Sequence, residues 1–398
     1  MMFHSKYFWL PGILLLVLFR MPSDDSSISS LTLLDLQKQV PEPPVKKHSQ
    51  SSLQEKDHAH STPKKTLDNP EKTGVPEPSI ICQDNDEITH GQWRPVTLPR
   101  SPYMPMSPRV RCLPSSAFSQ PFDTWEWQPS SCQLVRFDKQ EMIRLLHNQT
   151  VLFVGDSLSL EHYASLVHLL GERARLPPKA IKHGRIQRHI CTSDEEACMD
   201  LVFSTDFYLQ NMTHALFHTA KIPRVLVLNR GAHYTPDDEL MDSLRTRTWP
   251  VVQQWNDACR RQHYPQQKCL LIWRTTVPGH PHCHNFSQPA TSVHDMQEWI
   301  HEKSTNDPTV YRKGEYHWQD FQRQNQLVTH WIQQPVLSHT TIHIMDSYQT
   351  NILRPDNHRA HMNDCLHSCS PGGGSDLNSQ WLFHIIRVQE WQQQQQRL

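Results

Sequence analysis

The feature that most constrains the fold of this 398-residue chain is a series of apolar segments that alternate with helical patterns. Four segments are predicted to form buried strands with polar exits: Val151–Ser157 (VLFVGDS), Arg224–Gly231, Cys269–Thr276 and Thr341–Tyr348. Helical patterns cover Leu158–Leu170, Asp238–His263 and Phe321–Gln334. Strands alternating with helices predict an α/β fold with a parallel sheet and helices on both faces.

Polar residues follow three of the predicted strands where each strand ends. They are Gly155-Asp156-Ser157, Asn229-Arg230-Gly231 and Arg274-Thr275-Thr276. In a parallel sheet, sites form outside the carboxyl ends of the strands. These distant clusters are therefore expected to meet at one edge of the sheet.

Ser157 lies between a predicted strand and a predicted helix, which allows two interpretations. As an N-cap it would only accept a hydrogen bond from a backbone N–H of the helix. As a nucleophile it would stand at the sheet edge, where the helix N-terminus would help to stabilise an oxyanion. The second interpretation also requires a base that takes the serine proton.

The segment NDCLHSC supplies a possible base, because Asp364 and His367 are three residues apart. On a helical turn both side chains would share one face, and the carboxylate would orient the imidazole. A helix-capping pair is the simpler alternative. Metal binding through these residues with Cys365 and Cys369, or at the HPHCH cluster (280–284), is disfavoured because the usual second ligand pair is missing. No metal is expected.

The N-terminal composition predicts targeting to the secretory pathway. Residues 1–20 contain a short apolar stretch, which we interpret as a signal anchor; a cleaved signal peptide is the alternative. Residues 21–79 have no apolar period and are expected to form a disordered stem. A folded domain is expected over 80–390, followed by a Gln-rich tail at 391–398. The formal net charge of −1 argues against nucleic-acid binding.

Cysteine and asparagine patterns agree with an oxidising compartment. The ten cysteines are an even number, which suits disulfide bonds. Three N-x-Ser/Thr sequons are candidates for glycosylation, at Asn148, Asn211 and Asn285.

Beyond single residues, the chain resembles the trichome birefringence-like and PC-esterase group of GDSL/SGNH-type hydrolases. The resemblance covers about residues 82–381. Its motifs are CQDNDEITHGQWRP (82–95), WEWQPSSCQLVRFD (125–138), VLFVGDSLSLEHYASL (151–166), NRGAHY (229–234), LRPDNH (353–358) and DCLHSCSPGG (364–373). Plant members commonly carry Trp at the position of Ser368, so this chain departs from their pattern at the residue after His367.

The resemblance implies roles for individual residues. Ser157 would be the nucleophile, His367 the general base and Asp364 the residue that orients it. Oxyanion and substrate contacts are expected among residues at the strand ends, namely Gly155, Asp156, Asn229, Gly231 and Arg274, with the backbone N–H of Ser157. The group also implies a Cys-rich N-terminal segment packed on an SGNH-like sheet. Its expected disulfide joins Cys82 to Cys132, and Cys369 would tie the catalytic loop to another cysteine.

The activity implied by the resemblance is O-acetylation of a glycan or polysaccharide through an acetyl-enzyme. The alternatives are an acetylesterase of the same fold and a non-catalytic glycan-binding relative. No bound cofactor is expected, but an acetyl donor derived from acetyl-CoA is required. The expected location is the Golgi membrane, as a single-pass type II protein with a lumenal catalytic domain; secretion after signal-peptide cleavage is the alternative.

Overall fold

The computed structural model describes most of the chain beyond residue 79. The described residues are 80–98, 122–172, 184–218, 221–263, 268–307, 317–334, 341–359 and 363–397. They all belong to the compact unit Gly74–Leu398. The expected signal anchor (1–20) and stem (21–79) lie outside the described residues. Within the described part of the chain, the helices all fall short of the length and apolarity that a membrane span requires.

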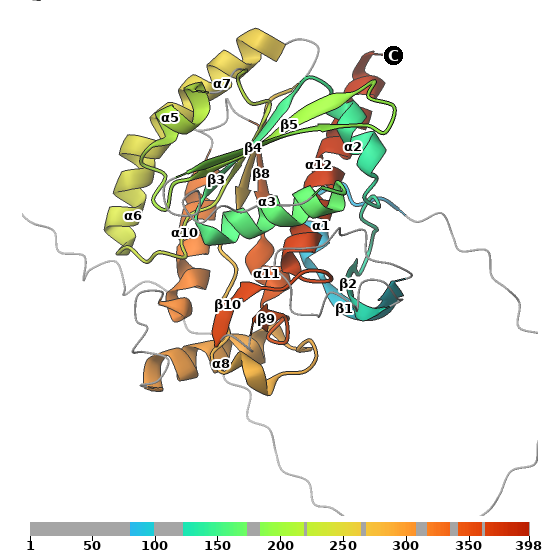
Figure 1. Cartoon of the computed structure of the whole chain (residues 1–398). Coiled ribbons are helices and arrows are strands. Elements are labelled where there is room, and N and C mark those ends of the chain that lie inside the picture. Colours follow the sequence, from blue (N-terminus) through green and yellow to red (C-terminus); the bar gives the residue numbers. More distant parts are fainter. Residues whose placement is uncertain are drawn as a thin grey trace, which may run out of the picture. The chain divides into compact units, whose positions relative to one another are not determined.

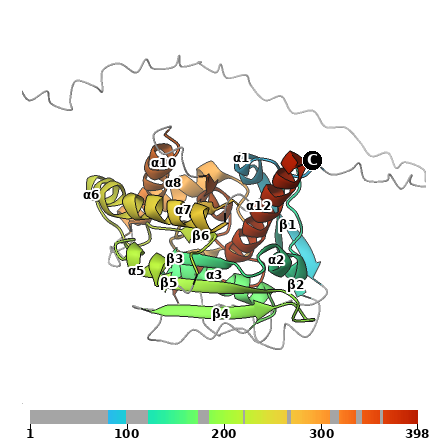
Figure 2. The same ribbon diagram turned by 90° about the horizontal axis from the view of Figure 1, so that it is seen from above.

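A six-stranded sheet forms the centre of this unit, with strand order β4-β5-β3-β6-β7-β8 (Figure 1). The strands are β3 (Thr150–Gly155), β4 (Arg185–Cys191), β5 (Cys198–Thr205), β6 (Val225–Leu228), β7 (Leu270–Arg274) and β8 (Ile342–Met345). Five strands run parallel, and β4 pairs antiparallel with β5 at the outer edge of the sheet (Figure 2). The predicted α/β fold with a mainly parallel sheet is therefore confirmed.

Helices cover both faces of the sheet. The continuously apolar sequence of β3 follows from this arrangement, because its side chains enter a buried core on each face. Val151 and Phe153 face one buried core, which also contains residues of α3 (Ser157–Leu169) and α12 (Gly374–Arg397). Leu152 and Val154 face a second core, shared with α5 (Met212–Phe217), α7 (Trp249–His263) and α10 (Phe321–Ile332). A strand buried on both faces needs apolar side chains at every position, not only at alternate ones.

The remaining helices differ from the predicted ones mainly at their ends. The predicted helix over 238–263 is built from α6 (Asp237–Ser243), a π-helical turn (Leu244–Thr248) and α7. The other α-helices in the described part of the chain are α1 (Asn85–Thr89), α2 (Lys139–Leu145), α8 (Val293–Asn306) and α11 (Ser347–Asn351). Residues 391–397, expected as part of a separate Gln-rich tail, continue α12.

The N-terminal segment packs on the sheet domain through a hairpin and a disulfide. The hairpin consists of β1 (Gly91–Leu98) and β2 (Phe122–Pro129). Its indole groups donate hydrogen bonds to backbone carbonyls: Trp93 to Thr350 at 2.9 Å and Trp127 to Ile88 at 2.7 Å. The Cys82–Cys132 disulfide fastens the start of this segment to the chain just after β2.

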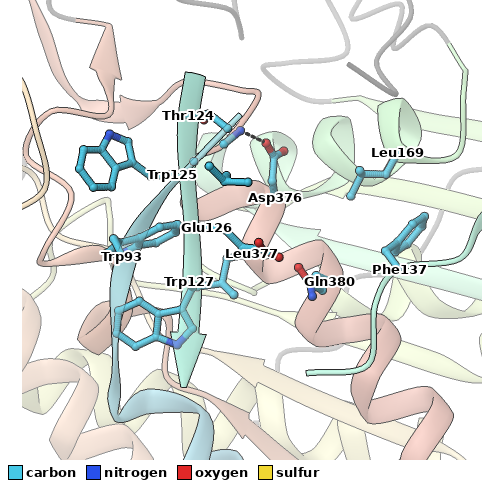
Figure 3. Close-up of a pocket in the computed structure, with 13 residues that line it drawn as sticks. Trp93, Thr124, Trp125, Glu126, Trp127, Phe137, Leu169, Asp376, Leu377 and Gln380 are labelled. Carbon is cyan, nitrogen blue, oxygen red and sulfur yellow. Dashed lines mark hydrogen bonds between the residues drawn. The ribbon is translucent and has the colours of Figure 1, made fainter. Parts of the chain in front are cut away.

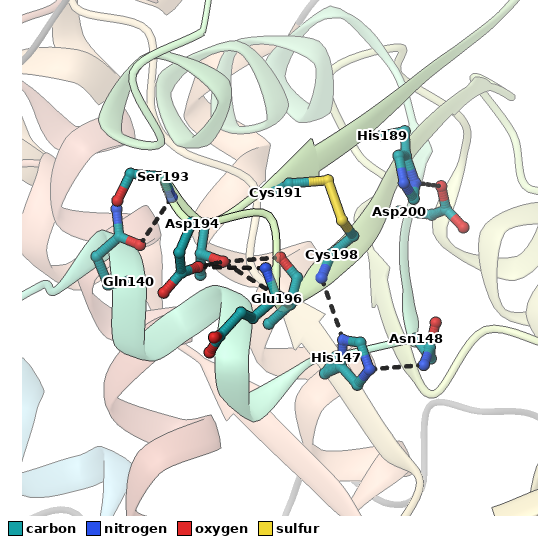
Figure 4. The surroundings of a disulfide bond; sticks show 12 residues. Gln140, His147, Asn148, His189, Cys191, Ser193, Asp194, Glu196, Cys198 and Asp200 are labelled. Atoms are coloured by element: carbon teal, nitrogen blue, oxygen red, sulfur yellow. Dashed lines mark hydrogen bonds and ion pairs between the residues drawn. A yellow bond between two sulfur atoms is a disulfide. The ribbon is translucent and has the colours of Figure 1, made fainter.

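Further disulfides secure the sheet and its connections. Cys191–Cys198 closes the antiparallel edge hairpin of β4 and β5 (Figure 4). Cys259–Cys269 joins the last turns of α7 to the start of β7.

The three sequon asparagines, Asn148, Asn211 and Asn285, are all exposed.

Candidate active site

Ser157 lies at the carboxyl end of β3 as the first residue of α3. The N-cap of this helix is Asp156, whose carboxylate accepts a hydrogen bond from the Leu158 backbone N–H at 2.9 Å. The interpretation of Ser157 as an N-cap is therefore wrong. Its partly exposed hydroxyl remains available for other contacts, and its backbone N–H belongs to the first helical turn, where N–H groups have no intrahelical partner.

Asp364 and His367 lie on a strand, not on the predicted helical turn. This strand, β10 (Asp364–Ser368), pairs antiparallel with β9 (His358–Arg359). Residues three apart in a regular strand point to opposite faces, but the pairing register shifts between Asp364 and Ser368. The irregular strand brings both side chains together, and the helix-capping interpretation fails with the helical turn.

The carboxylate of Asp364 holds the imidazole of His367 in a defined orientation. Asp364 Oδ2 lies 2.9 Å from His367 Nδ1. Asp364 Oδ1 also accepts hydrogen bonds from the backbone N–H groups of Leu366 at 3.2 Å and His367 at 3.1 Å. With its proton on Nδ1, His367 presents an unprotonated Nε2 to its other neighbour.

That neighbour is the Ser157 hydroxyl, which lies 2.8 Å from His367 Nε2. The two residues are 210 positions apart in the sequence. Ser157, His367 and Asp364 therefore form one continuous chain of hydrogen bonds. Ser157 lies on α3, and His367 and Asp364 lie on β10. A base that contacts a serine hydroxyl and is itself oriented by a carboxylate is the geometry required for nucleophilic catalysis.

Charge in the site favours an ion pair between Asp364 and His367. Burial alone would raise the pKa of Asp364, but the hydrogen bond and charge of His367 and the backbone N–H groups outweigh it and hold this pKa well below its ordinary value. Burial alone would lower the pKa of His367. The carboxylates of Glu161 and Asp364 outweigh this effect, so its pKa is raised.

The sequence analysis missed Glu161, which lies one helical turn after Ser157 on α3. Its Oε2 accepts hydrogen bonds from the Ser368 backbone N–H at 3.2 Å and from the Ser368 hydroxyl at 3.3 Å. Its Oε1 pairs with the Arg359 guanidinium. The spacing of four residues on a predicted helix could have placed Glu161 beside Ser157. Nothing in the sequence pattern pointed to Arg359.

Gly155 and Asn229 support the loop that carries Ser157. A Cβ atom on Gly155 would lie 2.3 Å from Ser159 Oγ and 2.8 Å from the Asn229 carbonyl oxygen, so only glycine fits this close approach. The amide nitrogen of Asn229 donates to the Arg274 carbonyl at 3.0 Å and to Thr276 Oγ1 at 3.1 Å. Both amide hydrogens of Asn229 are thus engaged within the fold.

Gly231 and Arg274 lie near the carboxyl ends of β6 and β7, respectively. Gly231 has a φ of +151°, and a Cβ atom there would lie 2.3 Å from Thr276 Oγ1. Arg274 is only 2 % exposed. Burial lowers its pKa to about 10, and the charges of Asp156 and Glu161 oppose that shift. Arg274 therefore lies in the interior of the fold.

The cysteines near the site, Cys283, Cys365 and Cys369, are all in disulfide bonds. Cys365 is bonded to Cys283 of the HPHCH cluster, and Cys369 is also disulfide-bonded. None of these three cysteines offers a thiolate for a metal ion. In the same cluster, the His280 ring contacts the Ile352 carbonyl at 2.9 Å through Nε2 and the ring of His358 at 2.6 Å through Nδ1.

A pocket of about 210 Å³ lies between the β1–β2 hairpin and α12 (Figure 3). Figure 3 shows Phe137 and Leu169 on the side opposite the hairpin, with Asp376, Leu377 and Gln380 of α12 between them. The pocket is lined mainly by apolar groups, and its lining includes none of the three residues of the Ser-His-Asp chain.

One family model matches the segment that carries Ser157, and several known proteins are similar to parts of this chain. Residues 134–221 match the GDSL/SGNH-like acyl-esterase family found in Pmr5 and Cas1p, the PC-esterase family. Xylan O-acetyltransferase 14 of Oryza sativa subsp. japonica is 29 % identical over 139 residues, which cover 34 % of this chain and 29 % of the relative. Xyloglucan O-acetyltransferase 4 of Populus trichocarpa is 29 % identical over 103 residues, 23 % of each chain.

A third relative, protein trichome birefringence-like 41 of Arabidopsis thaliana, is 31 % identical over 132 residues, which cover 32 % of this chain and 34 % of the relative. The matched segments thus span about a third or less of the length of these relatives. The family match contains Ser157 but ends before Asp364 and His367, whose contacts with each other and with Ser157 are seen in the structure. The chain is therefore similar to the PC-esterase family over residues 134–221, and over limited segments to xylan O-acetyltransferases and trichome birefringence-like proteins.

Proposed function

We propose that this protein is a glycan O-acetyltransferase that works through an acetyl-enzyme on Ser157. The observation that carries the proposal is the hydrogen-bonded chain from Ser157 through His367 to Asp364. The relatives named as xylan and xyloglucan O-acetyltransferases support the reaction class and a carbohydrate acceptor. The acetyl donor and the acceptor are both substrates, and no bound cofactor enters the proposed reaction.

In the first half-reaction, Ser157 Oγ attacks the acetyl carbonyl of the donor ester. His367 Nε2 accepts the hydroxyl proton, and Asp364 stabilises the imidazolium that forms. We propose that the Ser157 backbone N–H, in the first turn of α3, stabilises the oxyanion of the tetrahedral intermediate. The intermediate collapses to acetyl-Ser157, and the donor alcohol or thiol leaves with the proton from His367.

In the second half-reaction, a sugar hydroxyl attacks acetyl-Ser157. His367 removes the proton of that hydroxyl and returns it to Ser157 Oγ as the C–O bond to the enzyme breaks. Water in place of the sugar would give acetate, which is the esterase reaction. The description of the matched family as acyl-esterases makes this the second candidate function.

We propose the Golgi lumen as the place of reaction, with residues 1–20 as a type II membrane anchor and an acetyl-CoA-derived donor. The disulfide bonds and the exposed sequon asparagines support a location in the secretory pathway. Secretion after cleavage of a signal peptide is the alternative.

The test is a product analysis with the full-length chain, an activated acetyl ester as donor and a panel of oligosaccharides. We expect acetylated sugar to accumulate faster than free acetate. Ser157→Ala should abolish both products, whereas Ser193→Ala, at an exposed serine remote from the Ser-His-Asp chain, should change neither. Acetate as the sole Ser157-dependent product assigns the esterase reaction. Full activity of Ser157→Ala would disprove the proposed nucleophile.

A further inference from the structure

We propose that Glu161 is a second functional carboxylate of this site. It is a positioning residue that holds the His367 segment against α3 through Ser368 and sets its negative charge beside His367, opposite the positive charge of Arg359. The inference rests on the proposed function, because it assigns a role in the same Ser-His-Asp chain. It goes beyond that chain by explaining how two distant segments stay aligned.

The alignment follows from where Glu161 stands. Ser157 and Glu161 are four residues apart on α3, so their side chains share one helix face. Glu161 Oε2 accepts two hydrogen bonds from Ser368, the residue that follows His367 on β10. The helix that carries Ser157 is therefore hydrogen-bonded to the strand that carries His367, at the residue that directly follows His367. These bonds fix the distance across which Ser157 gives up its proton.

Glu161, Arg359 and Ser368 together form a clamp between α3, β9 and β10. The clamp is largely buried, so its charges are only weakly screened by solvent. The side chains of Glu161 and Arg359 are 7 % and 11 % exposed. A buried carboxylate is stable only when it is paired or hydrogen-bonded, and Glu161 has both the Arg359 ion pair and the Ser368 donors. Ser368 Oγ also contacts Ser375 Oγ of α12 at 3.0 Å, which adds a third segment to the clamp.

Charged and titratable groups of opposite sign surround His367. Glu161 on α3 and Asp364 on β10 favour its imidazolium, and Arg359 on β9 opposes it. Arg359 Nη1 lies 4.0 Å from Asp364 Oδ2, so this one cation faces both carboxylates. His358, whose ring lies 3.2 Å from the His367 carbonyl oxygen, has its pKa lowered to about 4 by burial and is neutral near pH 7.

A matched pair of neutral variants separates charge from simple packing. Glu161→Gln removes a negative charge and keeps a hydrogen-bond acceptor for Ser368. Arg359→Gln removes the opposing positive charge and keeps a donor for Glu161. We expect the His367 pKa to fall in the first variant and to rise in the second. A merely structural role would give shifts of the same sign or none.

The measurement is an NMR titration of the full-length chain labelled at histidine Cε1. The His367 signal is identified by its loss in His367→Asn, and thermal melting verifies that each variant is folded. The pH dependence of Ser157 labelling by a fluorophosphonate is measured in parallel, and its acid limb should move with the titration.

Opposite shifts in the two variants support the proposal, and unchanged or parallel shifts overturn it. Failure of the wild-type chain to react with the fluorophosphonate would count against Ser157 as a nucleophile, and thus against the proposed function. The NMR shifts would still decide the role of Glu161, because they do not depend on turnover.

Discussion

Replacement of Asp364 by Asn tests the proposed chemistry with little change in shape. Both carboxylate oxygens lie within hydrogen-bond distance of His367 Nδ1, Oδ2 at 2.9 Å and Oδ1 at 3.1 Å, and Oδ1 also accepts from two backbone N–H groups. An Asn oxygen can keep the backbone bonds, so its NH₂ group then faces His367 Nδ1. That contact favours the tautomer with its proton on Nε2, where it meets Ser157 Oγ. His367 can then no longer accept the serine proton.

We expect kcat to fall roughly 10,000-fold, as expected for a triad base held in the wrong tautomer. This corresponds to about 5 kcal/mol of lost transition-state stabilisation at 1.36 kcal/mol per tenfold. The assay is initial-rate acetyl release and transfer from the activated ester over about pH 5 to 9, a range that brackets histidine titration. Asp295→Asn, at an exposed carboxylate on α8, is the control and should have wild-type rates. A folded Asp364→Asn protein within tenfold of wild type would refute the reasoning.

Three further predictions concern pH, covalent links and packing. Because the pKa of His367 is raised, the acid limb of kcat/KM should lie above the ordinary histidine value of 6.5; a limb below it in a pH–rate profile would contradict the charge balance. Cys283→Ser removes the Cys283–Cys365 bond, which closes a sequence separation of 82 residues. It should cost about 4–5 kcal/mol in denaturant unfolding on the chain-entropy model, and no loss would show that β10 is held by other contacts. Gly155→Ala should lower both stability and kcat, since its Cβ would lie 2.3 Å from Ser159 Oγ; a wild-type melting temperature and rate would argue against this tight approach.

Strands β3, β6 and β7 of the central sheet could be predicted because they are buried on both faces and continuously apolar. VLFVGDS, for example, gives β3 and the start of α3, with bounds within a residue or two of the prediction. The edge hairpin of β4 and β5 was not predicted, because β4 (RIQRHIC) mixes polar and apolar residues and is closed by a short disulfide loop. Edge strands carry a weaker apolar pattern than central strands.

The residues of the Ser-His-Asp chain could be named from the sequence, but their local geometry could not. Spacing suggested a helical turn for Asp364 and His367, whereas an irregular strand brings them together. The clamp of Glu161, Arg359 and Ser368 depends on segments about 200 residues apart, and periodicity carries no information on such pairings. Likewise, Asn229 was expected near an oxyanion, and only the structure shows that its amide hydrogens are engaged elsewhere.

The most direct test of the account is mass spectrometry of the acid-quenched enzyme after brief exposure to the activated acetyl ester. The account predicts one acetyl group on the peptide that contains Ser157, which disappears when an acceptor glycan is added before the quench. It also predicts no adduct in Ser157→Ala. Turnover by the wild-type chain with no acetyl group on Ser157, or with the group on another residue, would contradict the acetyl-enzyme mechanism.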